Sequence, residues 1–340
     1  MSQMHTIDEN GSSPTCLDEG STIMVTGGMG FIGSNFIRHM LEAHPEFNYL
    51  NVDKLTYAGN PENLRDLENQ DNYRFLKADI CDKEAIGPAM GSCDAVVHFA
   101  AESHVDRSLE SAGEFIDTNV TGTFVLLQAA LNTNVKRFVM ISTDEVYGDI
   151  PPGSFSIETD SLLPRNPYSA SKVAADRLAY SYHEAFKLPV MITRSSNNYG
   201  PYQFPEKLIP HFITNLIQGK KVPLYGDGMN IRDWLYVGDN CRAIGDVLFH
   251  GKGGEVYNIG GGNERTNIEI TNQLLHALGK DSSMIRYVED RKGHDRRYAL
   301  KCGKITEELG WEPSMDFEAG LKLTVSWYLA NEDWWRTLLD

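Results

Sequence analysis

A tyrosine and a lysine four residues apart are the first side chains in this sequence that could perform acid–base chemistry. Tyr168 and Lys172 lie in "NPYSASKVAADRLA", where Pro167 fits an early position of a helix. Residues four apart share one face of a helix, so we expect the two side chains to lie together. A lysine ammonium favours the phenolate form and lowers the pKa of a tyrosine. The pair therefore predicts a base that removes a proton from a hydroxyl while a hydride leaves for a nicotinamide.

Two adjacent carboxylic acids form the second group of reactive side chains. Asp144 and Glu145 follow Thr143 in "STDEVYG", directly after the apolar run "RFVMI". Because residues alternate between the two faces of a strand, both acids can face one site only if the strand ends at about Thr143. When adjacent acids are desolvated together, their pKa values move apart, so one can be ionised while the other is protonated. The alternative interpretation of this segment is the N-cap of a helix.

Three glycines indicate where a dinucleotide would bind. Gly27, Gly30 and Gly33 lie in "VTGGMGFIGSNF", between a predicted strand and a predicted helix. Glycine permits a tight turn and the approach of a pyrophosphate to the helix N-terminus, where free N–H groups attract anions. Asp53 ends the next predicted strand, and an acid at this place hydrogen-bonds ribose hydroxyls and repels a 2′-phosphate. The sequence therefore predicts NAD, and not NADP, as the cofactor.

These groups lie near the ends of short apolar runs that alternate with helix-length segments. The runs include "TIMVTGG", "FNYLNVDKL", "YRFLKADI", "CDAVVHFAA" and "VKRFVMIST". Continuous apolar strands separated by helices predict an α/β fold with a Rossmann-type, doubly wound parallel sheet. Ligands bind outside the carboxyl ends of such strands. This rule adds further residues to the expected cofactor site, namely Asp79, Ile80, Phe99, Ala100, Ala101 and Ser103.

After about residue 195, prolines and glycines interrupt the chain and the pattern of a large parallel sheet is lost. Helices are predicted around 204–219 and 265–279, and "EVYNIGG" is typical of a strand that returns to the first sheet. We therefore expect a smaller, mixed α/β C-terminal lobe that binds the substrate over the ligand edge of the sheet. The expected division is a flexible extension over 1–20, an NAD-binding domain over 21–195 with segments returning near 230–262, and a substrate-binding lobe over 196–340.

Composition and charge exclude several classes of function. The 340 residues carry a formal charge of −16, whereas binding to a nucleic acid backbone needs a basic face. The five cysteines form no Cys-x-x-Cys pair, which argues against zinc and disulfides and favours the reducing cytoplasm. No apolar run reaches the roughly 20 residues of a membrane-spanning helix, and the polar, acidic start is not typical of a secretory signal. We expect no metal, no nucleic acid and no membrane partner.

Longer motifs narrow the function. "STDEVYG", "FAAESHVDRS", "SNNYGPYQFPEKLIP", "IRDWLYVGD" and "GHDRRYA" resemble those of the dTDP-glucose 4,6-dehydratases, extended short-chain dehydrogenases that act on nucleotide sugars. The resemblance runs from about residue 21 to the C-terminus. It implies that Tyr168 and Lys172 support oxidation at C4 of the sugar, with Thr143 hydrogen-bonded to the C4 oxygen. Glu145 then removes the C5 proton, Asp144 protonates the departing C6 hydroxyl, and hydride returns to C6.

The resemblance also implies the remaining binding residues. The expected cofactor contacts further include Phe31, Ile32, Lys54, Leu55, Thr56, Thr118 and Asn198, together with Tyr168 and Lys172. The nucleotide sugar is expected to lie against Ser103, Thr143, Asn197, Lys207, Leu208, Pro223, Leu224, Tyr225, Arg232, Asn267, Asp290, Arg291, His294 and Arg296. The basic members would gather positive charge for a pyrophosphate in an otherwise acidic protein. Two long helices, 113–133 and 166–187, would pair with those of a second subunit in a homodimer.

Three other functions fit parts of this pattern. A UDP-glucose 4,6-dehydratase would differ in the nucleotide base, whose contacts the sequence does not place, and the motifs favour dTDP. A UDP-sugar 4-epimerase would share the fold, NAD and the Tyr-Lys pair, but it has no use for two acids after Thr143. A non-enzymatic, NAD-sensing Rossmann protein would need neither the Tyr-Lys pair nor the acid pair.

Overall fold

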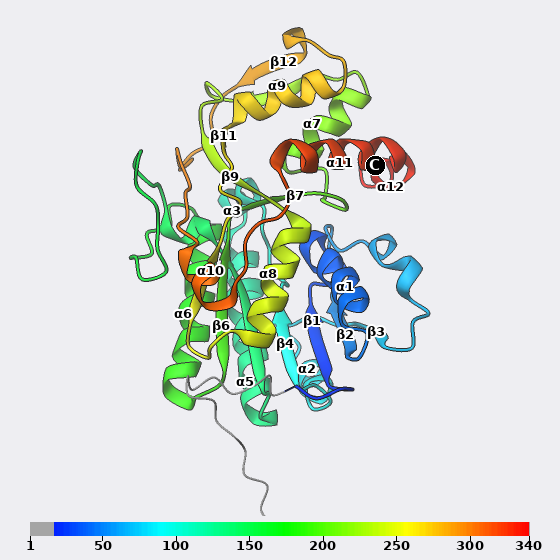
Figure 1. Ribbon diagram of the computed structural model, residues 1–340, viewed down its shortest axis with the longest axis vertical. Helices are drawn as coiled ribbons and strands as arrows, with labels where there is room; N and C mark the ends of the chain where they lie inside the picture. Colours follow the sequence, from blue (N-terminus) through cyan, green and yellow to red (C-terminus); the bar gives the residue numbers. More distant parts are fainter. Residues whose placement is uncertain (1–16, 340) are drawn as a thin grey trace, which may run out of the picture.

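The computed structural model describes residues 17–339, which form a sheet domain and a smaller lobe above it (Figure 1). Residues 1–16 of the expected flexible extension lie outside the described part of the chain. Within the rest of that extension, Leu17 is only 6% exposed and belongs to the apolar core. Leu17 thus departs from the flexibility expected over 1–20.

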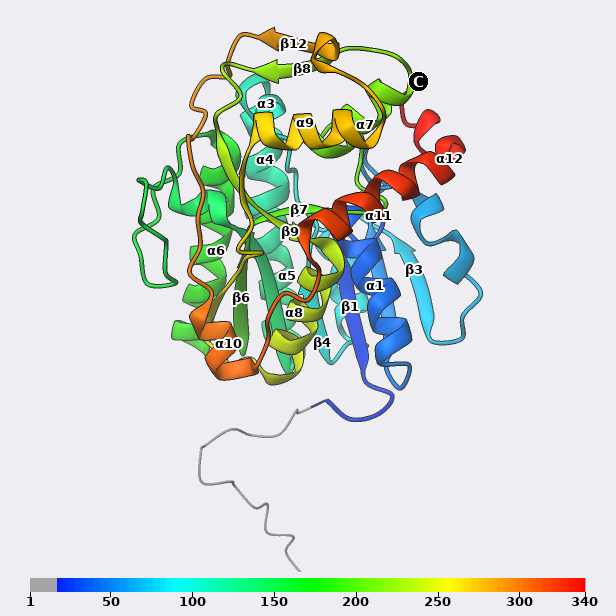
Figure 2. The ribbon, with the colours of Figure 1, turned by 45° about the horizontal axis from the view of Figure 1, so that its top comes forward.

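A single large parallel sheet forms the first domain (Figure 2). Its strands are β1 (Thr22–Thr26), β2 (Asn48–Asp53), β3 (Tyr73–Lys77), β4 (Ala95–His98), β5 (Arg137–Thr143), β6 (Val190–Ser195) and β10 (Val256–Ile259). They lie in the order β10-β6-β5-β4-β1-β2-β3, and every neighbouring pair is parallel. The order reverses between β1 and β4, and doubly wound sheets bind ligands at such a switch point. The predicted fold class is confirmed.

Helices cover both faces of this sheet, because its strands are apolar on both sides. One face packs against α1 (Phe31–Ala43), α8 (Val237–His250) and α10 (Gly303–Leu309), and the other against α2 (Lys83–Met90), α5 (Thr123–Thr133) and α6 (Pro167–Phe186). Before α5 the chain forms α3 (Val105–Glu110), α4 (Ala112–Phe115) and a π-helical segment, η3 (Ile116–Gly122). The helix expected over 113–133 is thus built from α4, η3 and α5, and the one expected over 166–187 is α6.

The smaller lobe has two short sheets and its own apolar core. One sheet contains β7 (Asn197–Tyr199), β9 (Ile231–Tyr236) and β11 (Glu264–Thr266), and the other contains β8 (Val222–Tyr225) and β12 (Ile285–Val288). The helices are α7 (Leu208–Ile217), α9 (Asn267–Ala277), α11 (Phe317–Ala330) and α12 (Glu332–Arg336). The predicted helices around 204–219 and 265–279 are α7 and α9, each shorter at both ends. Short 3₁₀ turns complete the chain at η1 (Pro61–Asn63), η2 (Arg65–Leu67), η4 (Asp144–Tyr147) and η5 (Ser282–Met284).

The chain passes between the two parts several times. After β9 in the lobe, α8 and β10 return to the sheet domain, where β10 pairs with β6. After the lobe elements β11 to β12, α10 returns as well, because Ile305 and Trp311 pack into the core shared by α1 and α8. We therefore propose a sheet domain that includes α10 in addition to α8 and β10, which lie within the returning segments expected near 230–262.

Neither a membrane-spanning helix nor a metal cluster is found in the part of the chain from residue 17 to residue 339. No helix there combines the length and the apolar character that crossing a bilayer requires. No three His, Cys, Asp or Glu side chains in that range gather in a way that could hold a metal ion.

His98 joins the sheet to its helical cover beneath the ligand edge. Its imidazole lies between two hydroxyls, with Thr26 Oγ1 2.7 Å from Nδ1 and Thr123 Oγ1 3.0 Å from Nε2. The Thr123 hydroxyl already donates to Asn119 O, so it accepts from Nε2–H, and Nδ1 accepts from the Thr26 hydroxyl. The neutral ring is therefore fully hydrogen-bonded, and burial lowers the pKa of His98 to about 3.

Replacing His98 with glutamine should reveal an acid-sensitive contribution to stability. The folded state holds the ring neutral, whereas unfolded histidine titrates near 6.5, so protonation favours unfolding as the pH falls below that value. Relative to His98→Gln, the wild-type protein should lose about 2 kcal/mol of unfolding free energy between about pH 7.5 and pH 5. Urea unfolding of both proteins at the two pH values measures this difference, and an equal loss in both would contradict it.

Candidate active site

A cavity of about 700 Å³ lies between the lobe and the carboxyl edge of the sheet. The predicted cofactor residues on its wall are Gly27, Gly30, Phe31, Ile32, Gly33, Asp53, Lys54, Thr56, Asp79, Ile80, Phe99, Ala100, Ala101, Ser103, Thr118, Tyr168, Lys172 and Asn198. Leu55 does not line the cavity. Its backbone has a φ of +59°, and its N–H turns back to donate to Asp53 Oδ1 at 2.8 Å.

The glycine loop after β1 leaves space that side chains would otherwise fill. Gly27 has a φ of +72°, and a Cβ atom on it would lie 2.6 Å from the backbone nitrogen of Ala100. A Cβ atom on Gly33 would lie 2.3 Å from the Gly27 carbonyl oxygen. The helix α1 begins at Phe31, and its N-cap residue, Gly30, makes no side-chain hydrogen bond to the helix. The first N–H groups of α1 are therefore free to bind an anion. The loop therefore fits the pyrophosphate of a dinucleotide.

The acid at the end of β2 holds this loop in place. The Asp53 carboxylate accepts the Met29 N–H at 2.9 Å as well as the Leu55 N–H, and burial raises the pKa of Asp53. Asn198 also lines the cavity, and its side-chain oxygen is buried and finds no hydrogen-bond partner among residues 17–339. A glycine cradle, an acid at the ribose end and a free amide oxygen are together a set of groups that fits NAD.

The two adjacent acids face the cavity from a tight turn. β5 ends at Thr143, as predicted, and η4 follows at once. The Thr143 hydroxyl accepts the Glu145 N–H at 3.3 Å, so the N-cap interpretation also holds, for this single 3₁₀ turn. Asp144 is 3% exposed, and its Oδ2 atom has no partner in the described part of the chain. Both acids line the cavity because the strand has ended.

The two carboxyl groups have unequal surroundings. Burial, followed by the charge of Glu145, raises the pKa of Asp144 well above its ordinary value. Burial also raises the pKa of Glu145, but the cations Arg232 and Lys207 oppose this shift. Arg232 acts on Asp144 too, whereas the Asp233 carboxylate works against it there. Asp144 is therefore the group that keeps its proton, and Glu145 is the group that ionises first.

Tyr168 and Lys172 lie on one face of α6 and are 8% and 5% exposed. The Lys172 ammonium donates to Ile141 O at 2.7 Å, and burial lowers the pKa of Lys172 to about 8. Burial and the Glu145 charge raise the pKa of Tyr168, although a hydrogen bond with Thr143 opposes them. The protein's own groups thus raise the tyrosine pKa overall, in the direction opposite to the lowering expected from Lys172.

The cavity wall also carries polar and basic groups. The predicted substrate residues on this wall are Ser103, Thr143, Asn197, Lys207, Leu208, Pro223, Leu224, Tyr225, Arg232, Asn267, Arg291 and His294. Lys207 Nζ donates to Ser103 O at 2.7 Å, and the Arg232 guanidinium lies 4.2 Å from the ring centre of Tyr298. Asn197 and Asn267 each bury a side-chain oxygen that has no partner within the described residues. These oxygens are suited to donors of a bound ligand.

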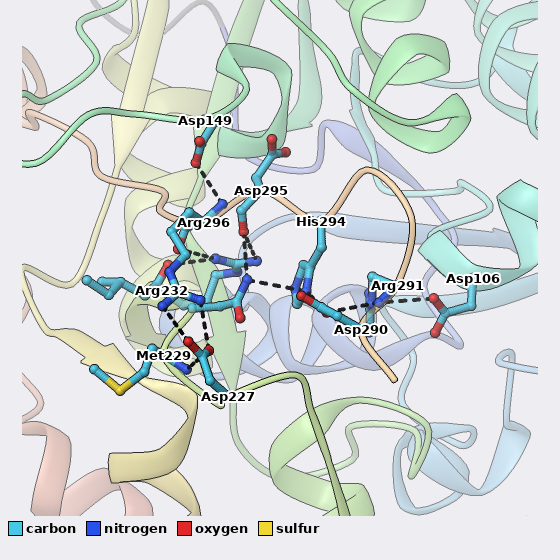
Figure 3. Close-up of polar contacts among 12 residues, drawn as sticks. Asp106, Asp149, Asp227, Met229, Arg232, Asp290, Arg291, His294, Asp295 and Arg296 are labelled. Carbon is cyan, nitrogen blue, oxygen red and sulfur yellow. Dashed lines mark hydrogen bonds and ion pairs between the residues drawn. The ribbon is translucent and has the colours of Figure 1, made fainter. Parts of the chain in front are cut away.

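Two predicted substrate residues, Asp290 and Arg296, do not contribute to the cavity wall. Figure 3 shows the polar contacts that they make instead. Asp290 bonds His294 Nδ1 at 2.6 Å, and Arg296 pairs with Asp227 at 2.8 Å, where both side chains are about half exposed. Asp295 lines the cavity, whereas the neighbouring Arg296 is turned to Asp227 and does not.

Several residues on the wall escaped the sequence prediction. Tyr298 donates to Asp295 Oδ2 at 2.7 Å, and its hydroxyl lies 3.4 Å from Glu145 Oε2, on a residue 153 positions earlier in the chain. Asn166 and Glu206 also line the cavity. Tyr298 and Glu206 both fall inside quoted motifs, "GHDRRYA" and "FPEKLIP", which is the signal that could have found them.

Residues 24–324 match the sequence model of the GDP-mannose 4,6 dehydratase family. A dTDP-glucose 4,6-dehydratase from an Actinoplanes species is 51% identical over 318 residues, which cover 92% of this chain and 99% of that protein.

Solved structures show the same similarity. DesIV, a dTDP-glucose 4,6-dehydratase from Streptomyces venezuelae crystallised with NAD, is 51% identical with a TM-score of 0.91, over 93% of this chain and 99% of that chain. The UDP-glucose 4-epimerase of Thermus thermophilus is 30% identical with a TM-score of 0.85, over 91% of this chain and 99% of that chain. The fold is thus common to both enzymes, while the identity separates them. The chain belongs to the dTDP-glucose 4,6-dehydratase family of NAD-dependent nucleotide-sugar hydro-lyases.

Proposed function

We propose that this protein converts dTDP-glucose to dTDP-4-keto-6-deoxyglucose and water. The observation that carries the proposal is the presence of Asp144 and Glu145 in one cavity with Tyr168. NAD, when bound, accepts a hydride from C4 of the sugar and returns it to C6. A ketone at C4 makes the C5 proton acidic, so the side chains have to remove one proton and deliver another within a small space.

Tyr168 is the proposed base for the C4 hydroxyl. Because burial and Glu145 raise its pKa, the phenolate needs a positive charge nearby. Lys172 lies one helical turn along α6 and stays charged at neutral pH, since its pKa is about 8. Its bond to Ile141 O fixes the ammonium beneath the cavity, and the Thr143 hydroxyl orients the phenol.

Glu145 is the proposed base for the C5 proton, and Asp144 the proposed acid for the C6 hydroxyl. The unequal pKa shifts support this order, because Asp144 keeps its proton while Arg232 and Lys207 favour the ionised form of Glu145. The Tyr298 hydroxyl, which lies 3.4 Å from Glu145, limits the directions that this carboxylate can take.

Three cations are the proposed ligands of the pyrophosphate. Lys207, Arg232 and Arg291 line the cavity, and an otherwise acidic protein brings them together there. Arg291 lies over the Tyr225 ring at 4.8 Å and pairs with Asp106 of α3 at 3.4 Å. The base preference for thymine is proposed from the relatives alone.

We also propose that two subunits pair through the helical layer containing α5 and α6. These helices lie side by side on one face of the molecule (Figure 1). Ile116 and Phe124, which belong to η3 and α5, are 49% and 46% exposed. Large apolar side chains that are exposed together are typical of a protein–protein interface.

Incubation with dTDP-glucose and NAD should give a product lighter by one water molecule, as measured by mass spectrometry. Tyr168→Phe keeps the ring but removes the proposed base, so kcat should fall by about 10²- to 10⁴-fold. Unchanged mass with galactose formed would identify an epimerase instead, and no reaction with any sugar nucleotide would indicate a cofactor sensor. Faster turnover of UDP-glucose would reassign the base preference.

Reaction in D₂O separates the proposed roles of the two acids. Glu145→Gln should lose both C5 deuterium exchange and water loss, because the C5 proton has no base. Asp144→Asn should retain C5 exchange in recovered substrate while water loss slows by about 10²- to 10⁴-fold. Deuterium NMR of the sugar measures both. Exchange that persists in Glu145→Gln would assign the C5 base to another residue.

A charge in the proposed interface should separate the subunits. Phe124→Glu should give a monomer in sedimentation velocity at concentrations where the wild-type protein is a dimer. Phe155→Glu is the matched control, because Phe155 is equally exposed, at 51%, but lies on the loop before α6. A dimer that survives Phe124→Glu, or a wild-type monomer, would contradict the proposed pairing.

A further inference from the structure

A buried ion pair lies behind the cavity wall. Arg194 on β6 is 1% exposed, and Asp176 on α6 is fully buried. The Nε and Nη2 atoms of Arg194 lie 2.9 and 3.1 Å from the two carboxylate oxygens of Asp176. Removing two charges from water is costly, and an apolar cluster of the same volume is often at least as stabilising. The two parallel hydrogen bonds instead fix the relative orientation of Arg194 and Asp176, which non-directional apolar contacts do not.

The remaining guanidinium nitrogen of Arg194 links this ion pair to η4, the turn that contains Asp144 and Glu145. Nη1 of Arg194 donates to Tyr147 Oη at 2.8 Å, and the guanidinium lies 4.9 Å from the centre of the Tyr147 ring. Tyr147 is the last residue of η4, two positions after Glu145, and is 3% exposed. Its own hydroxyl donates to Asn258 Oδ1 on β10 at 2.8 Å. Hydrogen bonds thus connect η4 with β6, β10 and α6.

The acid of the ion pair, Asp176, lies on α6, the helix that also carries Tyr168 and Lys172. Asp176 follows Lys172 by four residues and Tyr168 by eight, so the three side chains lie along one face of α6. The Asp176 charge also opposes the fall in the pKa of Lys172. A displacement of η4 relative to α6 would therefore have to break a fully buried bond.

We propose that Asp176, Arg194 and Tyr147 form a positioning network that keeps the acid pair in register with the Tyr168–Lys172 pair. None of the three lines the cavity, so they act through the elements that they hold. The Tyr-Lys pair serves the oxidation at C4, and the acids serve the elimination that follows at C5 and C6. The network therefore governs the second step more than the first. This inference rests on the residue roles proposed above.

Tyr147→Phe is the sharpest test, because it deletes one oxygen atom and keeps the ring in the core. With the turn no longer fixed, kcat should fall by about 10- to 100-fold, the effect of a misplacement of about 1 Å. Elimination then becomes the slow step, so substrate carrying deuterium at C5 should show a larger isotope effect than with the wild-type enzyme. Loss of folded protein alone would lower the rate and leave the isotope effect unchanged.

Arg177→Ala is the matched control. Arg177 also donates to Asp176 Oδ1, at 2.8 Å from Nε, but its side chain is 43% exposed and it lies on α6 itself. This variant should keep the wild-type rate and isotope effect. Asp176→Asn should reproduce the larger isotope effect in whatever fraction folds, and if it does not fold, Tyr147→Phe decides alone.

A Tyr147→Phe enzyme with the wild-type isotope effect would overturn the inference at any rate of turnover. The Glu145→Gln exchange experiment distinguishes this failure from a failure of the proposed roles. If Glu145→Gln blocks C5 exchange while Tyr147→Phe leaves the isotope effect unchanged, the roles stand and only the network is refuted. If Glu145→Gln keeps C5 exchange, the proposed roles themselves are refuted.

Discussion

Burial of Asp144 beside the charge of Glu145, within one cavity, is the constraint on which the rest of the site depends. Two neighbouring carboxylates cannot easily ionise together when they are desolvated, so one of them holds a proton at a pH where both would otherwise have lost it. The strand has to end at Thr143 for the two to meet, and the 3₁₀ turn that follows satisfies its first free N–H with the Thr143 hydroxyl. The end of β5 at Thr143 thus determines both the backbone geometry of the turn and the acid–base chemistry of the two acids.

The lobe supplies the positive charge that opposes the rise in the pKa of Glu145. Lys207 and Arg232 come from segments beyond the sheet domain, and both favour the ionised form of Glu145. Lys207 is fixed to Ser103 O of the sheet domain, and Arg291 is paired with Asp106 on α3. The lobe is therefore attached to the sheet by the same kind of groups that surround the sugar nucleotide site, so its position and the charge state of the acids are coupled.

Features that depend on short spacing could be predicted from the sequence. The glycine loop, Asp53, the end of β5 and the Tyr168–Lys172 pair each follow from a few adjacent residues and the period of one element. Features that depend on which way the side chains of a loop segment face could not be predicted from the sequence. Arg296 and Asp295 are neighbours in "GHDRRYA", yet only Asp295 reaches the cavity. The direction of the Tyr168 pKa shift also escaped prediction, since burial and then the charges of Glu145 and Asp144 raise this pKa, and burial is a property of the whole fold.

β10 is an edge strand of the large sheet, and this position has a consequence for synthesis on the ribosome. β6 emerges from the exit tunnel well before β10, because β7, α7, β8, β9 and α8 lie between them in the chain. Until β10 pairs with it, β6 has an exposed edge of unpaired amide and carbonyl groups. Such an edge can pair with other polypeptide chains. We therefore expect a chain that stalls on the ribosome within the lobe to expose this edge and to be prone to aggregation.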